Sequence, residues 1–132
     1  MAAGVIPAIR VRDMAAALDF YVDRLGFVVQ RGGPNDDNCA LTRGDARVML
    51  EVAGDMFSER YNEAIRSRIG SVSPTALYIE ADDLEALYAR CLESGVEVAD
   101  PLADRPWGQA EFTVAEPEGQ WLTFWRASSV GT

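Results

Sequence analysis

The sequence repeats one order of secondary-structure elements, and this repeat constrains the fold more than any other feature. A strand, an aspartate suited to begin a helix, a helix ended by glycine, and three further strands are expected twice along the chain. Gly26-Phe27-Val28-Val29 matches Gly95-Val96-Glu97-Val98, and Asp13 matches Asp82 at the same spacing of 69 residues. Either Asp82 or Asp83 is expected to cap the second helix. The sequence therefore predicts two βαβββ modules of about 60 residues each.

The two modules are expected to form a single domain, because 132 residues suit one hydrophobic core better than two. The first module covers about residues 5–53 and the second about 74–127. Between them lies a linker, 54–73, in which the spacing of Tyr61, Ile65 and Ile69 predicts a short helix. The expected fold class is α+β, in which the modules pair into a curved mixed sheet around a hollow suited to a ligand.

A hairpin near the C-terminus is expected to line one wall of that hollow. Gln109–Ala115 alternates apolar and polar residues, as a half-buried strand does, and residues 120–126 are almost continuous in β-formers. Glu116-Pro117-Glu118-Gly119 supplies the turn between them. Just before the hairpin, residues 101–106 are expected to form a loop, at whose end Pro106-Trp107-Gly108 places an indole. Trp107 either walls the ligand cavity or caps the core, and the residues alone leave both roles open.

The chain contains no histidine, and this absence narrows the chemistry sharply. It removes imidazole acid–base catalysis, Ser-His-Asp triads and imidazole metal ligands together. The net charge of −9 argues against a nucleic-acid partner, because phosphate contacts need an excess of basic side chains. The same charge favours a cationic small molecule if carboxylates line a cleft.

The expected compartment is the cytoplasm. No apolar run approaches the roughly 20 residues of a membrane span, so we expect no membrane partner. The N-terminus also lacks the basic start and apolar stretch of a signal peptide. Cys39 and Cys91 lie far apart without metal-type spacing, and we expect both to be reduced, buried thiols.

Three segments resemble the vicinal oxygen chelate superfamily, which includes glyoxalase I, extradiol dioxygenases, fosfomycin resistance enzymes and bleomycin-resistance proteins. They are residues 9–13 (IRVRD), 20–27 (FYVDRLGF) and 116–119 (EPEG). The pattern FYxDxLGF followed late by a PxG turn is typical of the superfamily but of no single activity. The resemblance implies the double βαβββ fold.

The resemblance also bears on metal binding. The metalloenzyme branches hold a divalent ion with one histidine or glutamate from each of four strands. By the spacing of the motifs, those places fall here on Ile6, Met49, Thr75 and Thr123. None is a ligand for a Lewis-acid metal, so the resemblance implies a member without a metal or other cofactor.

The resemblance is closer to bleomycin-resistance proteins. Residues 24–27, 36–37, 106–108, 111–112 and 116–119 resemble that branch in order and spacing. Those proteins are not enzymes but dimers that sequester a cationic glycopeptide antibiotic in clefts between subunits. The likeness implies a homodimer in which Trp107 stacks on planar rings of the drug while acidic residues meet its positive tail. A second aromatic position of that branch falls on Asn38, which makes another aromatic or peptidic compound as good a candidate as bleomycin.

The candidate ligand-binding residues are drawn from both modules, and no catalytic residue is assigned. Glu51, at the end of an apolar strand, is the strongest carboxylate candidate. Tyr61 and Met56 either form a lid over the site or only pin the linker. The full set expected to contact a ligand is Trp107, Gly108, Asp37, Asn38, Met49, Glu51, Tyr61 and Glu111.

Three functions remain open, and we favour the first. The chain is a metal-free binding protein that sequesters an antibiotic or other small ligand as a dimer. Alternatively, it is a metal-independent lyase, isomerase or cyclase acting on an aromatic metabolite, with Glu51, Tyr61 or Glu111 transferring protons. The weakest alternative is a glyoxalase-like or dioxygenase-like metalloenzyme that uses only carboxylates. Whether a hollow is built within one chain or by strands of two is also open.

Overall fold

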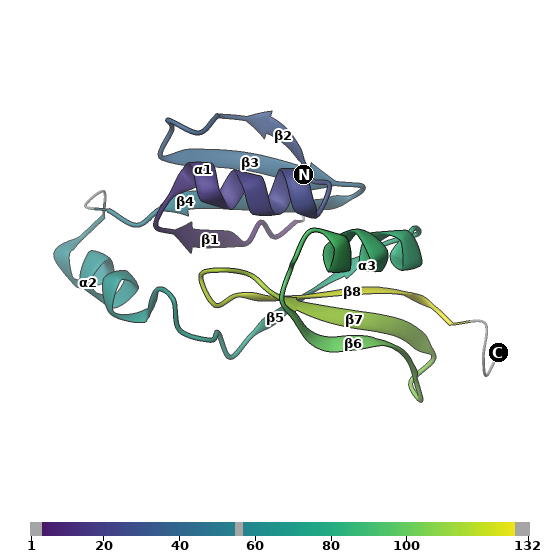
Figure 1. Ribbon diagram of the computed structural model, residues 1–132. Coiled ribbons are helices and arrows are strands. Elements are labelled where there is room, and N and C mark those ends of the chain that lie inside the picture. The colour runs from purple at the N-terminus through teal and green to yellow at the C-terminus, as the bar shows by residue number, and fades with distance from the viewer. Residues whose placement is uncertain (1–3, 55–56, 129–132) are drawn as a thin grey trace. The chain divides into compact units, whose positions relative to one another are not determined.

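The computed structural model describes residues 4–54 and 57–128, and the chain divides into two compact units (Figure 1). Unit 1 ends at Ser71 and unit 2 begins at Val72. Each unit contains one of the two expected modules, and the linker helix belongs to unit 1. The α+β class is confirmed, whereas the grouping of both modules into one domain stays a prediction.

Unit 1 builds a four-stranded mixed sheet with the strand order β1-β4-β3-β2. β1 runs parallel to β4, and the other neighbours are antiparallel. Its elements are β1 (Ala8–Val11), α1 (Met14–Leu18), the π-helical turn η1 (Asp19–Arg24), β2 (Val28–Arg31), β3 (Asn38–Arg43), β4 (Ala46–Val52) and α2 (Glu59–Arg68).

Unit 2 repeats this topology with the strand order β5-β8-β7-β6. β5 runs parallel to β8, as β1 does to β4. Its elements are β5 (Ala76–Glu80), α3 (Leu84–Glu93), β6 (Val98–Arg105), β7 (Gln109–Ala115) and β8 (Trp121–Ala127). The two predicted βαβββ modules are therefore confirmed, and each completes a mixed sheet of its own. A ligand hollow shared by the modules and a dimer stay predictions.

Each sheet buries one face against its helix. In unit 1, Tyr21 is fully buried and makes edge-to-face contacts with Phe20 and Phe27, at centroid distances of 5.2 and 5.5 Å. In unit 2, the ring of Phe112 lies 5.5 Å from that of Phe124, and α3 packs against β6 and β8 (Figure 1). Cys39 and Cys91 are buried free thiols in these cores, as expected. We call the opposite face of each sheet its open face.

The helices of both modules have an aspartate at the N-cap position. The side chain of Asp13 accepts a hydrogen bond from the backbone N–H of Ala16 and caps α1. In unit 2 the N-cap position is occupied by Asp83 rather than Asp82. The match of Asp13 with Asp82 at a constant spacing is therefore wrong by one residue.

The first helix is one residue longer than the second, and the additional residue lies in η1. The two N-caps are 70 residues apart, whereas Gly26 and Gly95, which leave the helices with φ of 84° and 75°, are 69 apart. The backbone N–H of Leu25 donates to the carbonyl of Phe20, five residues back, at 3.1 Å. This wider hydrogen-bonded turn accommodates one more residue than an α-helical turn does.

Strand β6 is longer than expected, because residues 101–106 were predicted to form a loop. The strand tolerates Pro101 because it lies at the edge of the sheet and its register with β7 shifts on both sides of Asp100. Strand β7 has its predicted bounds but not its predicted one-sided burial. Glu111 and Thr113 on its polar face are only 4% and 8% exposed, and the site explains why.

Candidate functional site

The turn between β6 and β7 presents Trp107 to solvent. Gly108 has a φ of 89°, and its N–H donates to the carbonyl of Arg105, which closes the turn. Trp107 is 62% exposed, yet its indole Nε1–H donates to Oε1 of Glu111 at 2.9 Å. The ring is thus both accessible and held in place, so the alternative that Trp107 caps the core is not supported by its position.

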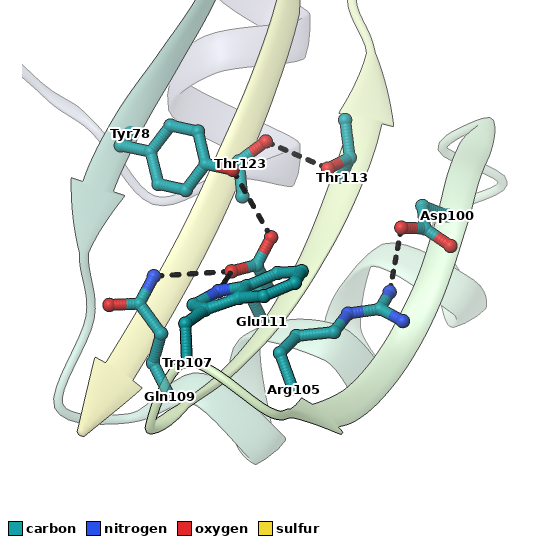
Figure 2. Close-up of polar contacts among 8 residues, drawn as sticks. All are labelled: Tyr78, Asp100, Arg105, Trp107, Gln109, Glu111, Thr113 and Thr123. Atoms are coloured by element: carbon teal, nitrogen blue, oxygen red, sulfur yellow. Dashed lines mark hydrogen bonds and ion pairs between the residues drawn. The ribbon is translucent and has the colours of Figure 1, made fainter. Parts of the chain in front are cut away.

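Glu111 collects three hydrogen bonds on the open face of unit 2 (Figure 2). Besides Trp107, Gln109 Nε2 donates to Oε1 at 3.1 Å, and the hydroxyl of Tyr78 donates to Oε2 at 3.4 Å. We call Tyr78, Trp107, Gln109 and Glu111 the Glu111 cluster. These contacts cover the carboxylate and account for its burial.

All three donors to Glu111 are electrically neutral. Arg105, on the neighbouring strand, pairs with Asp100 at 2.6 Å, and among residues 4–54 and 57–128 no arginine forms an ion pair with Glu111. A buried carboxylate without a counter-ion is costly, so it would gain from a cation. The pKa of Tyr78 is raised by desolvation and then by the charge and hydrogen bond of Glu111, which keeps the phenol protonated as a donor.

Thr123 lies next to this cluster, opposite Tyr78, and is one of the four residues on which the resemblance places the family's metal positions. Its hydroxyl lies 2.7 Å from that of Thr113, and both side chains are buried. Thr123 pairs with Tyr78 and Thr113 across the sheet, as Met49 pairs with Ala8 and Ala40 in unit 1. The two residues therefore hold equivalent positions in the two modules.

Ile6 and Thr75, the other two positions, lie just before β1 and β5 rather than in those strands. Together with Met49 and Thr123 they offer a thioether, two hydroxyls and a hydrocarbon. Within the part of the chain that the structure describes, no three His, Cys, Asp or Glu side chains gather into a metal-binding group. This donor set does not fit a divalent ion.

A second polar row crosses the open face of unit 1. Glu51 is 8% exposed and accepts a hydrogen bond from Asn38 Nδ2 at 3.1 Å on its Oε2. Its Oε1 lies 3.6 Å from Nη2 of Arg10, a distance suited to an ion pair but not to a hydrogen bond. Arg31 in turn donates to the side-chain oxygen of Asn38. Unlike Glu111, Glu51 is therefore neutralised within its own unit.

Tyr61 joins this row from α2. The guanidinium of Arg10 donates to its hydroxyl and lies 5.4 Å from its ring centroid and 5.6 Å from that of Phe57. The two rings are 4.4 Å apart, and Ser58 caps the helix that carries Tyr61. Beside them is a hollow of about 10 Å³, room for about one water molecule, lined by Arg10, Val52, Ala53, Gly54, Phe57, Tyr61, Asn62 and Ile65. Met56 lies outside the described residues.

The eight predicted ligand residues thus fall into two places. Unit 2 brings together Trp107, Gly108 and Glu111, whereas unit 1 links Asn38, Glu51 and Tyr61 through Arg10. Met49 is half-buried on the same open face. Asp37 is exposed, and its backbone carbonyl accepts a hydrogen bond from Val52.

Sequence reasoning missed Tyr78, Gln109 and Arg10 as residues of these places. Tyr78 and Arg10 alternate with buried residues along their strands, Ile79 and Ile9, so their period-2 position on the open face was available as a signal. No such signal in the sequence indicates their partners, because Glu111 and Glu51 lie on strands that are distant in sequence.

The fold and these positions can be compared with known proteins. The family model of the Glyoxalase/Bleomycin resistance protein/Dioxygenase superfamily matches residues 5–124. The chain belongs to this superfamily. Among its curated relatives, an uncharacterized protein of Mycobacterium bovis is 30% identical over 90% of this chain and 82% of that protein. A bleomycin resistance protein of Geobacillus stearothermophilus is 25% identical over 92% and 94% of the two chains.

Solved structures share the fold of this chain. A bleomycin-binding protein from bleomycin-producing Streptomyces verticillus, complexed with copper(II)-bleomycin, superposes with a TM-score of 0.63 at 26% identity, covering 94% of this chain and 95% of that one. TioX from Micromonospora sp. ML1 gives a TM-score of 0.71 at 21% identity over 96% and 99% of the chains. The described residues contain no helix long and apolar enough to cross a bilayer.

Proposed function

We propose that this superfamily member is a metal-independent small-molecule binding protein of the bleomycin-resistance type. It sequesters a cationic or planar aromatic antibiotic without altering it, in a cleft between the two subunits of a homodimer. Trp107 supplies the stacking surface, and acidic side chains attract the positive part of the ligand.

One observation carries this proposal: Trp107 is 62% exposed while its indole nitrogen is fixed on a buried carboxylate. An exposed indole that only covered a core would have no need of such an anchor. A ring held in one orientation loses little freedom when a flat ligand stacks on it, so more of the stacking energy appears as affinity. The relatives that bind or confer resistance to bleomycin support the same ligand class.

The open face of unit 1 carries the other predicted ligand residues. Asn38, Met49 and Glu51 face one side of that sheet, and Tyr61 reaches the same row from α2. We propose that these residues, together with Asp37, also contact the ligand.

The test is a titration of intrinsic tryptophan fluorescence with bleomycin, its copper(II) complex and a panel of planar aromatic antibiotics. We expect saturable quenching by at least one compound, and recovery of that compound with unchanged mass after days of incubation. Sedimentation of the protein with and without the compound measures the expected dimer. Absence of saturable quenching across the panel would contradict sequestration.

Two variants make the titration specific to the proposed site. Trp107→Ala should abolish both the quenching and the binding measured by equilibrium dialysis. Trp121→Phe is the matched control, because Trp121 is 36% exposed at the start of β8 and lies opposite Ala115 rather than Glu111. It should lower the total fluorescence and leave the affinity unchanged.

A second candidate function rests on the contacts of Arg10. Because Arg10 joins Glu51 to the hydroxyl of Tyr61, the two residues could exchange a proton with an aromatic metabolite, as in a metal-independent lyase, isomerase or cyclase. Conversion of a panel compound, lost on Glu51→Gln and retained on Trp107→Ala, would favour this enzyme over the binding protein.

A further inference from the structure

The Glu111 cluster offers two exposed aromatic rings rather than one. Tyr78 is 57% exposed and Trp107 is 62% exposed. Figure 2 shows the carboxylate of Glu111 between the phenol and the indole, each bonded to a different oxygen. Tyr78 reaches it from β5, on the far side of β8 from β7, so the two rings flank the sheet's open face from opposite sides.

The shared carboxylate also changes the electronic character of both rings. When a phenol O–H or an indole N–H donates a hydrogen bond to an anion, electron density shifts from that bond into the ring. The face of the ring then becomes more negative. Negative ring faces attract cations, and the charge of Glu111 behind them adds to that attraction. Every donor to Glu111 is neutral, and the guanidinium of Arg105 on the neighbouring strand is ion-paired with Asp100.

We infer that Tyr78 is a second stacking wall of the Trp107 site, and that Glu111 makes this site selective for aromatic ligands that carry positive charge. The inference rests on the proposed function for the ligand class. It adds Tyr78 as the aromatic residue that replaces the stacking face missing at Asn38. It also names Glu111 as the group that selects for positive charge. Glu51 does not do the same in unit 1, because Arg10 already neutralises it.

The probe for this inference is proflavine, a planar tricyclic cation, followed by its own fluorescence anisotropy. The comparison compound is acridine-9-carboxylate, which has the same ring system and a negative charge. We expect the protein to bind proflavine and to prefer it to the anion by at least about tenfold. Tyr78→Ala and Trp107→Ala should each weaken proflavine binding by at least about fivefold, whereas Tyr78→Phe keeps most of the affinity.

The selectivity of the site is tested by Glu111→Gln, which keeps an oxygen acceptor but removes the charge. It should weaken proflavine binding by at least about tenfold and abolish the preference over the anion. The matched control is Glu80→Gln, because Glu80 is exposed on the same face of β5 and belongs to no contact of the cluster. This variant should bind proflavine as the unmodified protein does.

The outcomes separate this inference from the proposed function. If bleomycin-type compounds fail to bind but proflavine behaves as described, antibiotic sequestration is wrong and the charge-selective site stands. If an antibiotic binds and Tyr78→Ala changes neither ligand's affinity, sequestration stands and the second wall is overturned. Failure of the unmodified protein to bind proflavine overturns the inference directly. If Glu111→Gln folds poorly, Tyr78→Ala still tests the second stacking wall, because it removes an exposed ring and should leave the fold intact.

Discussion

The hydroxyls of Thr113 and Thr123 lie 2.7 Å apart on β7 and β8, and both side chains are buried. Thr123→Val should leave the Thr113 hydroxyl buried without its partner and lower the free energy of unfolding by about 1–3 kcal/mol. The double change to valine should cost less than the sum of the single changes, because no polar group is then left unpaired. Urea denaturation of the unmodified protein, Thr113→Val, Thr123→Val and the double variant measures these free energies of unfolding. If the losses of the two single variants simply add in the double variant, the two hydroxyls are not coupled.

The ion pair of Arg10 with Glu51 is expected to matter for stability because both side chains are largely buried, at 14% and 10% exposed. Arg10→Met should lower the free energy of unfolding by about 3 kcal/mol, since it leaves a buried carboxylate without its cation. Adding Glu51→Gln should recover much of this loss. The matched control is Arg47→Met, at an exposed position of β4, which should change little in the same denaturation experiment.

Glu116 should make the stability depend on pH. Burial raises its pKa from 4.5 to about 7, although backbone hydrogen bonds from Glu118 and Gln120 oppose the shift. Between these two values the folded chain holds a proton that the unfolded chain has released, so the free energy of unfolding falls as the pH rises from about 4.5 to 7.

Glu116→Gln should remove that decline. At pH 8 the variant should be more stable than the unmodified protein by up to about 3 kcal/mol, and near pH 4.5 the two should be similar. Thermal or urea unfolding across this pH range measures the difference. Glu97→Gln, which changes an exposed carboxylate, should leave the pH profile as it is. An equal decline in both variants would assign the effect to another group.

The order of the Trp107 ring should depend on Glu111. In a background in which Trp121 and Trp125 are replaced by phenylalanine, Trp107 is the sole fluorophore of its kind. Glu111→Ala should then lower its fluorescence anisotropy and raise its quenching by acrylamide, because the indole loses its hydrogen bond. Tyr78→Phe serves as the control that removes a different donor from the same carboxylate. Unchanged anisotropy in Glu111→Ala would mean that the turn alone orients the ring.

Much of the fold follows from local patterns in the sequence. Strand β7 has the bounds that its residues predict, and the glycines after both helices mark the ends as expected. Strand β6 was underestimated because Pro101 suggests a loop, whereas an edge strand with bulges accommodates it. The spacing of the repeat was off by one because nothing in the residues 19–24 marks a π-helical turn.

The residues of the site were easier to predict from the sequence than the contacts between them. Trp107 and Glu111 were both named from the sequence, yet their hydrogen bond depends on the geometry of the turn between β6 and β7. Tyr78 and Arg10 were missed because their roles come from partners across the sheet. Such pairings depend on strand register, which the sequence constrains only through its apolar pattern.

The π-helical turn η1 also sets the rotational phase at which the chain leaves the first helix. An α-helix advances about 100° per residue, so one additional residue in a regular helix would swing the outgoing chain by about that angle. The wide turn avoids this swing, so the N–H of Phe27 donates to the carbonyl of Tyr21 and its ring packs against the ring of Tyr21 in the core. The wide turn accommodates the additional residue without changing the course of the chain at either end of the helix. The two modules therefore keep the same topology although their helices differ in length.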